Sequence, residues 1–150
     1  MICNAENVIY SSNSDEWETP KDVFERLNEE FHFTLDPCAT VANAKCEMFY
    51  SKQDNGLKKN WGGQKVFCNP PYSEVAKWAK KAYEESKKPG TVVVLLVPSR
   101  TDTRWFHEYV YHRAEIRFVK GRIKFSNAKF NAPFPSMIAI FGAEGQESLF

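Results

Sequence analysis

The segment Asn69-Pro70-Pro71-Tyr72 holds the residues whose types and spacing are best suited to chemistry. A short apolar run, 66–68, precedes it and an amphipathic stretch follows, so it lies where a strand ends and a helix begins. Proline fixes φ, has no N–H and keeps the preceding residue extended, so two prolines in a row make a stiff corner. This corner presents two acceptors, the Asn69 side-chain oxygen and the Pro70 carbonyl, beside the flat ring of Tyr72. It is therefore suited to hold a planar amine of a ring or an amide.

An amine such as adenine N6 is a poor nucleophile, because its lone pair is delocalised into the ring. Fixed acceptors on both of its hydrogens favour the more tetrahedral nitrogen of a transition state, and one preorganised partner of this kind contributes roughly 3 kcal/mol. No strong base is then needed before attack on an activated methyl group. The alternative interpretation is a proline-rich turn that ends a strand and caps a helix with Ser73.

The composition predicts a soluble globular chain. A length of 150 residues fits one domain over 1–150, with residues 1–12 and 143–150 as peripheral tails and no separate target-recognition domain. No run of 18 apolar residues indicates a membrane span, and the first 16 residues lack the basic and apolar regions of a secretory signal. We expect a cytoplasmic protein.

The cysteines and histidines do not indicate a metal site. The four cysteines form neither a CxxC pair nor a zinc-type spacing, and we expect them to be reduced thiols. The three histidines show no ligand pattern either, since His107 and His112 are five residues apart and would not share a helix face.

Charge is distributed unevenly although the net charge is only +1. Residues 1–60 carry 6 Lys/Arg and 11 Asp/Glu, whereas residues 100–130 carry 8 Lys/Arg and 3 Asp/Glu. This asymmetry predicts one basic face. A phosphate-binding surface and a merely solvated surface are both compatible with it.

Strand-like and helix-like segments alternate along the chain. Thr19 as N-cap and Pro20 at the first helical position predict a helix start. The apolar run of residues 91–97 predicts a strand buried on both faces. The other expected strands are 32–35, a short one near 48–50, 65–68, 115–119, 121–125 and 135–141, and the other expected helices are 74–88 and 103–111.

This alternation predicts an α/β fold with a mostly parallel, doubly wound sheet. Such sheets bind ligands beyond the carboxyl ends of their strands. Asp36, Asn69 and the segment Ser99-Arg100 all follow predicted strands, so we expect them to share one rim.

The motifs together resemble those of the phage-type DNA N6-adenine methyltransferases, a Dam-like phage family. The resemblance covers roughly residues 12–142. The Asn-Pro-Pro-Tyr motif alone is shared with methyltransferases of glutamine amides and guanine amines, whereas Arg-Thr-Asp-Thr-Arg-Trp-Phe is more particular to the phage family. The motifs that carry it are WETP (17–20), DPCA (36–39), NAKC (43–46), DNGL (54–57), FCNPPY (67–72), VPSRTDTRWF (97–106), GRIKF (121–125) and PFPS (133–136).

The resemblance implies a Rossmann-like, SAM-dependent methyltransferase fold with an antiparallel edge near the C-terminus, and S-adenosylmethionine (SAM) as cofactor. It places Thr19 and Pro20 near the methionine carboxylate, Asp36 near the methionine amine and Asp54 at the adenine N6 of SAM. The alternatives are a plain N-cap for Thr19, a loop cap for Asp36 and a turn residue for Asp54. The remaining expected cofactor-binding residues are Trp17, Pro37, Cys38, Ala39 and Asn69.

For DNA, the resemblance implies that Asn69, Pro70, Pro71 and Tyr72 hold a flipped adenine. Phe125 or Phe134 would stack on the other face of the base, or pack in the core. Arg100 and Arg104 are candidates for phosphate contacts, or would pair with Asp102 or a buried carboxylate. Arg122 and Lys124 are expected to contact DNA as well.

Two features depart from the methyltransferase pattern. The Asp-Pro-Cys-Ala loop has no glycine where these enzymes usually have a glycine-rich turn, and the ribose partner is unassigned, with Glu47 as a candidate. Sequence readout would come from loops 37–64 or 120–134, or from a second copy of the chain. The alternative functions are a methyltransferase of a protein glutamine amide or an RNA amine, and a non-catalytic nucleic-acid-binding module. The expected cellular location is the cytoplasm of a bacterial host.

Overall fold

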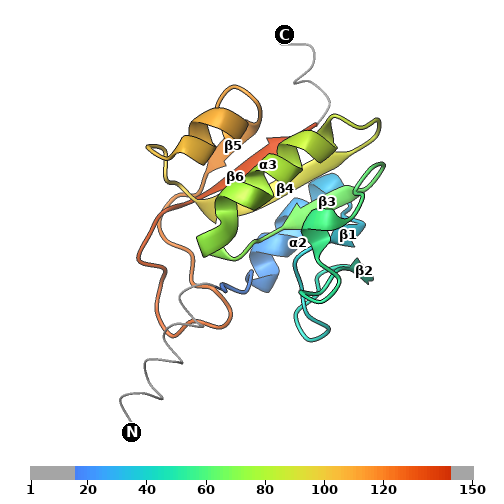
Figure 1. The fold of residues 1–150 in the computed structure, drawn as a ribbon. Coiled ribbons are helices and arrows are strands. Elements are labelled where there is room, and N and C mark those ends of the chain that lie inside the picture. The colour runs from blue at the N-terminus through green and yellow to red at the C-terminus, as the bar shows by residue number, and fades with distance from the viewer. Residues whose placement is uncertain (1–15, 143–150) are drawn as a thin grey trace, which may run out of the picture.

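The computed structural model describes residues 16–142, so Cys3 and both expected tails lie outside the described residues. A six-stranded sheet with the order β2-β1-β3-β4-β6-β5 forms its centre (Figure 1). The first four strands of this order pair in parallel, and β6 is antiparallel to both of its neighbours. The strands are β1 Leu35–Asp36, β2 Met48–Phe49, β3 Lys65–Cys68, β4 Val92–Pro98, β5 Glu115–Phe118 and β6 Ser136–Phe141.

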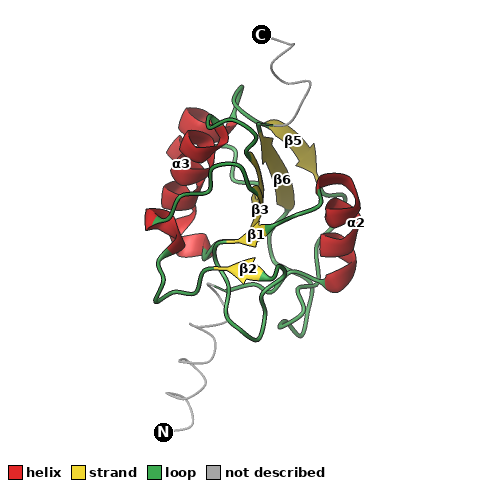
Figure 2. Cartoon of the chain, turned by 90° about the vertical axis from the view of Figure 1, so that its right-hand side faces the viewer, coloured by secondary structure: helices red, strands yellow, loops and turns green. Residues whose placement is uncertain are grey.

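Helices cover both faces of the sheet. Figure 2 shows α2 (Lys21–Phe31) on one side and α3 (Val75–Ser86) on the other. The short π-helix η3 (Phe106–Val110) packs beside α3. This mixed α/β arrangement, mostly parallel with an antiparallel edge, confirms the predicted fold class at that level.

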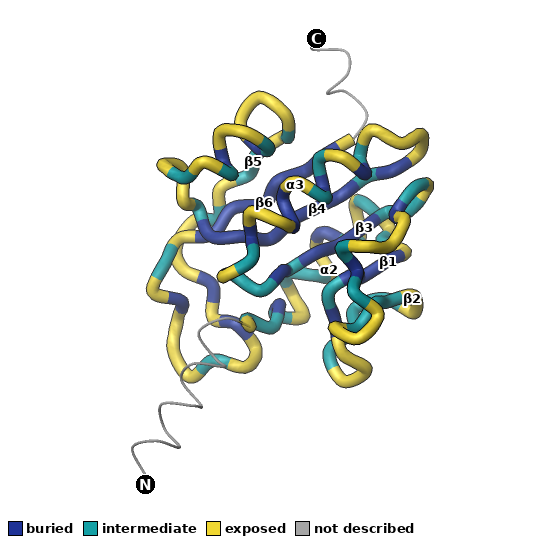
Figure 3. The backbone as a smooth tube through the Cα atoms, viewed as in Figure 1, coloured by how far each residue is buried: buried dark blue, intermediate teal, exposed yellow. Residues whose placement is uncertain are grey.

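Strand β4 separates two apolar cores, because successive side chains of a strand point to opposite faces. Val93, Leu95 and Val97 pack in the core that includes α3, whereas Val94 and Leu96 pack in the core that includes Leu27 of α2. Figure 3 shows β4 and β6 as the continuously buried centre of the molecule. The prediction of a strand buried on both faces is confirmed.

The strand order reverses between β1 and β3. From β1 the chain moves outward to β2, and it then returns to place β3 on the opposite side of β1. At such a reversal the connections leave the sheet in opposite directions, which opens a crevice outside the carboxyl ends of the two strands. Asp36 ends β1 and Asn69 follows β3, so both lie at this crevice.

Three predicted helix boundaries differ from the structure. Pro20, not Thr19, is the N-cap of α2, with φ −62° and ψ 146°. The helix predicted over 74–88 is α3, which runs over Val75–Ser86 after a 3-10 turn of residues 72–74, and its N-cap is Glu74 and not the Ser73 of the alternative interpretation. The predicted helix 103–111 is reduced to one short helical segment around the π-helix.

Two strand predictions are also wrong. Residues 121–125 form a loop, although Ile123 and Phe125 are buried as an alternating strand would bury them. The strand predicted for 32–35 starts only at Leu35, because His32 adopts a left-handed conformation that ends α2, with its N–H donated to the Asn28 carbonyl. No helix within 16–142 is long and apolar enough to cross a membrane.

Candidate active site

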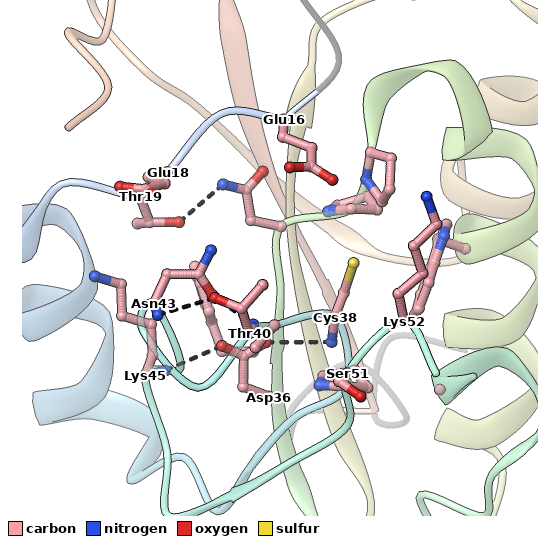
Figure 4. Close-up of a pocket in the computed structure, with 18 of the residues that line it drawn as sticks. Glu16, Glu18, Thr19, Asp36, Cys38, Thr40, Asn43, Lys45, Ser51 and Lys52 are labelled. Carbon is pink, nitrogen blue, oxygen red and sulfur yellow. Dashed lines mark hydrogen bonds between the residues drawn. The ribbon is translucent and has the colours of Figure 1, made fainter. Parts of the chain in front are cut away.

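A pocket opens at the carboxyl ends of β1 and β3 (Figure 4). It brings together nine of the predicted site residues, which are Trp17, Thr19, Asp36, Pro37, Cys38, Ala39, Asn69, Pro70 and Pro71. Residues that sequence reasoning did not assign to the site complete the lining, and they are Glu16, Glu18, Thr40, Asn43, Lys45, Ser51, Lys52, Asn55, Gly56, Leu57, Phe67, Glu74 and Trp78.

Asp36 is a buried carboxylate at the pocket, with only 4% of its surface exposed. Its Oδ1 accepts the Cys38 N–H at 3.3 Å and its Oδ2 accepts the Lys45 N–H at 3.1 Å (Figure 4). Burial raises the pKa of Asp36 to about 6, against the opposing effect of these two hydrogen bonds. Asp36 therefore caps its loop and also supplies a negative charge that a cation would stabilise.

Gly56, from the segment after β2, approaches the Asp-Pro-Cys-Ala loop closely. A Cβ on Gly56 would lie 2.1 Å from the Pro37 carbonyl oxygen, so only glycine lets the two segments approach this closely. The buried Trp61 indole donates to the Gly56 carbonyl at 3.0 Å, and the Trp61 N–H donates to the Glu85 carboxylate on α3. The wall of the pocket is thus attached to the core.

The Asn69 side chain is held in one orientation. Its Nδ2 donates to the Trp17 carbonyl and to Thr19 Oγ1, the latter at 2.9 Å. A backbone carbonyl can only accept, so the nitrogen must face Trp17 and the oxygen must face away. Asn69 Oδ1 is buried and accepts no hydrogen bond from any residue within 16–142. The predicted acceptor is therefore available for a ligand.

Tyr72 lies in an aromatic cluster that we define as Trp17, Tyr72, Phe125 and Phe134. Ring centroids within the cluster are 5.3 to 6.5 Å apart, and Tyr72 stacks on Trp17 with an interplanar angle of 26°. Burial raises the pKa of Tyr72, and its hydroxyl has no partner among the described residues. Phe125 is fully buried, whereas Phe134 is partly exposed. Of the two, Phe134 is better placed to meet a ligand.

Several candidate residues do not line the pocket, namely Pro20, Glu47, Asp54, Tyr72, Phe125 and Phe134. Asp54 is exposed, and its Oδ2 accepts both the N–H and the hydroxyl of Ser51, at 2.8 and 2.9 Å. These hydrogen bonds also lower the pKa of Asp54. Glu47 precedes β2, at the amino end of that strand, whereas the pocket lies at the carboxyl ends. The residues after β2 that line the pocket are Ser51, Lys52, Asn55, Gly56 and Leu57.

The four basic DNA-binding candidates are exposed and lie in segments that leave the sheet at the carboxyl ends of β4 and β5, with Arg104 in the short helical segment before η3 and the other three in loops. Arg100 and Arg104 follow β4, and Arg122 and Lys124 lie between β5 and β6. Arg104 makes one loose contact of 3.9 Å with Glu108, and both side chains are largely exposed. None of the four lines the pocket.

The described cysteines are free thiols, and none belongs to a group of His, Cys, Asp and Glu able to hold a metal within 16–142. Burial raises the pKa of Cys46 to about 12 and also raises the pKa of the fully buried Cys68. Cys38 and Cys46 are both half-buried, and of the described cysteines only Cys38 lines the pocket.

Known proteins resemble this chain over most of its length. The chain is 38% identical over 109 residues to the DNA N-6-adenine-methyltransferase of Escherichia phage T1, a match of 71% of this chain and 45% of that protein. It is 34% identical over 119 residues to the protein of the same name from Haemophilus phage HP1 (strain HP1c1), a match of 77% and 69%. The match therefore spans about half of the phage T1 protein. The model of the DNA N-6-adenine-methyltransferase (Dam) family matches residues 7–140, and the chain belongs to this family.

Proposed function

We propose that this chain transfers a methyl group from SAM to the N6 amine of adenine in DNA, in a Rossmann-like fold. The observation that carries this proposal is the orientation of Asn69, whose Nδ2 is fully used by Trp17 and Thr19 while its buried Oδ1 has no partner among the described residues. A buried acceptor without a partner is costly, so it indicates a ligand that donates a hydrogen bond. Both phage relatives are named as DNA N-6-adenine-methyltransferases, which supports adenine N6 as that donor.

Asn69 Oδ1 and the neighbouring Pro70 carbonyl would accept the two N6 hydrogens. Accepting both shifts electron density towards N6 and favours the geometry in which its lone pair attacks. The acceptors are fixed before the reaction, because the hydrogen bonds from the Asn69 amide to Trp17 and Thr19, together with the two prolines, hold the corner in one conformation. SAM supplies an activated methyl group when bound, and this chain contributes position and electrostatics.

SAM fits the chemistry of the pocket. Its ammonium group is a cation that the buried carboxylate of Asp36 would stabilise. Apolar walls from Pro37, Leu57 and Trp78, with the polar side chains of Thr40 and Asn43, suit an adenosine moiety. In this arrangement Asp54 does not contact the ligand, and its role is to close the turn with Ser51.

SAM affinity is expected to fall as pH decreases through about 6. Below this value Asp36 is protonated in the free protein, so the favourable interaction with the ammonium is lost, at about tenfold in affinity per pH unit. Stability of the free protein should change in the opposite sense, because a raised pKa stabilises the fold at low pH and this contribution is lost as pH rises through 6. Calorimetric titration from pH 5 to 8 measures the affinity, and a pH-independent affinity would exclude Asp36 as the ammonium partner.

The direct test is methyl transfer from SAM to duplex DNA, read as N6-methyladenine by mass spectrometry of the nucleosides. We expect methylated adenine and unmodified cytosine. Parallel reactions with RNA and with a glutamine-containing peptide separate the other amine and amide substrates. Absence of product on DNA together with product on RNA or peptide would overturn the substrate assigned here.

Replacing both Arg100 and Arg104 with alanine is expected to weaken DNA binding and flatten its salt dependence. Each lost phosphate contact lowers the slope of log affinity against log salt by about 0.9, so the double variant should lose about 1.8. Both side chains are exposed, so the fold and SAM affinity should persist. Arg26→Ala, which removes an exposed arginine of α2, is the matched control. An unchanged slope would assign the phosphate contacts elsewhere, with residues 120–129 as the next candidates.

A further inference from the structure

Residues 16–19 form a segment, here called the strap, that reaches the Asn69 side chain from a distant part of the sequence. The Trp17 carbonyl and the Thr19 hydroxyl accept both hydrogens of the Asn69 amide. Thr19 is buried, with 3% of its surface exposed, and its Oγ1 is not a helix cap because Pro20 occupies the N-cap position. The Thr19 hydroxyl therefore serves Asn69 and not α2.

The two acceptors of the strap determine which atom of the amide faces the substrate. Rotating the Asn69 amide by 180° would place Oδ1 against the Trp17 carbonyl oxygen, and two acceptors repel each other. Without such partners the χ2 angle of an asparagine side chain varies over a broad range. The strap thus selects the orientation in which Oδ1 can accept from an amine.

A second set of contacts fastens the strap to the loop of residues 119–135. Asn127 pairs with the strap backbone in both directions, since its Oδ1 accepts the Glu18 N–H at 2.9 Å and its Nδ2 donates to the Glu16 carbonyl at 2.8 Å. The Ser126 N–H donates to the Glu18 carbonyl at 2.9 Å. These residues are more than 100 positions apart in sequence, so the contacts are tertiary.

The ring of Trp17 holds the strap from the other side. It lies 5.4 Å from Phe125 and 5.3 Å from Phe134, centroid to centroid, and both of these phenylalanines belong to the 119–135 loop. Arg122 and Lys124, which we expect to contact DNA, lie on the same loop. The strap is therefore the structural link between the basic loop and the Asn69 amide.

We propose that Thr19 and Asn127 are positioning residues: Thr19 orients the Asn69 amide for methyl transfer, and Asn127 holds the strap that carries Thr19. This proposal rests on the methyltransferase function proposed above. Neither residue needs to touch the target base for this role, since both act through Asn69.

Thr19→Val keeps the shape of the side chain and removes the acceptor, so it separates orientation from packing. Loss of one neutral hydrogen bond predicts a decrease of about 3- to 10-fold in the single-turnover rate at saturating SAM and DNA. Thr19→Ser retains the hydroxyl and should restore the rate. In an Asn69→Ala background, Thr19→Val should cause no further decrease, because the group it orients is gone. A further decrease of the same size in that background would show that Thr19 acts directly on a ligand.

Asn127→Ala breaks both contacts with the strap backbone and should lower the same rate, while SAM affinity stays within about threefold. Lys80→Ala is the control, since it removes an exposed side chain of α3 that does not line the pocket and should leave the rate unchanged. Equal rates for wild type and Asn127→Ala would remove Asn127 from the proposal.

A measurement without turnover keeps the proposal distinct from the proposed function. The side-chain amide protons of Asn69 can be identified by NMR as the pair that disappears in Asn69→Ala. Their exchange with solvent should be slow in the wild type and clearly faster in Thr19→Val and Asn127→Ala. Unchanged exchange in both variants would overturn the positioning role. Failure of the wild type to methylate adenine would instead overturn the proposed function and leave the exchange result to decide the role of the strap.

Discussion

Replacing Asn69 with alanine is expected to lower the single-turnover rate of adenine methylation by about 10²–10³-fold, the loss typical of one preorganised transition-state partner. The variant removes the Oδ1 acceptor but keeps Pro70 and Pro71, so the corner should retain its backbone. The Trp17 carbonyl and the Thr19 hydroxyl of the strap lose the hydrogen bonds that the Asn69 amide donates to them. The side chains that line the rest of the pocket are unchanged. SAM affinity should therefore stay within a few-fold of wild type.

The rate must be measured at saturating SAM and DNA, with the fold of the variant verified by its melting temperature. Lys80→Ala, which removes an exposed side chain of α3 away from the pocket lining, is the control. Near-normal turnover by Asn69→Ala would mean that the Asn-Pro-Pro-Tyr corner is only a turn that ends β3. The proposed function would then lose the observation on which it rests.

The sequence was sufficient to predict those elements for which the local residue pattern and the burial in the folded protein favour the same structure. The run of residues 91–97 is apolar at every position from Val92 because β4 is buried on both faces, and the corner at Asn69 follows β3 because prolines exclude a longer strand. The rim shared by Asp36 and Asn69 followed from the rule that parallel strands present their carboxyl ends together.

The errors arose where a distant partner decides the role of a residue. Thr19 matches a helix cap by local pattern, but its hydroxyl receives the Asn69 amide from 50 residues away. Residues 121–125 alternate like a strand, but both edges of β6 are already paired, with β4 and β5, so burial of Ile123 and Phe125 is achieved by a loop. Such competition for partners is tertiary and leaves no local signal.

The absence of a glycine from the Asp-Pro-Cys-Ala loop is also explained by a residue from another part of the chain. Methyltransferases usually place a glycine in that turn, whereas here Gly56 approaches Pro37 from the segment after β2. The same close approach of backbones is achieved with the glycine on the opposite chain segment. Asp-Asn-Gly-Leu contains this glycine, but the sequence analysis assigned the motif to a SAM contact by Asp54 or to a turn, and not to a close approach by Gly56.

Tyr72→Ala is expected to destabilise the fold by about 3 kcal/mol, because it removes a ring from the aromatic cluster and leaves a cavity. For a chain of this size the melting temperature should fall by about 6–12 °C. The variant should also capture the flipped base less well, since stacking contributes roughly 1–3 kcal/mol per base. Its effect on methylation would thus combine the destabilised aromatic cluster with the loss of the ring on which the base stacks. A second variant is needed to separate these two effects.

Tyr72→Phe separates the two contributions. The Tyr72 hydroxyl is buried without a partner among the described residues, and burial raises its pKa, so the ring and not the oxygen carries the packing. Removing an unsatisfied buried hydroxyl should leave the melting temperature unchanged or raise it slightly. Methylation at saturating substrates should stay within a few-fold of wild type if Tyr72 serves only as a stacking surface. A decrease of tenfold or more in a stable Tyr72→Phe variant would show instead that the hydroxyl donates a hydrogen bond to the bound nucleotide. The Tyr72 hydroxyl would then lack a protein partner for the same reason as Asn69 Oδ1, because its partner is the ligand.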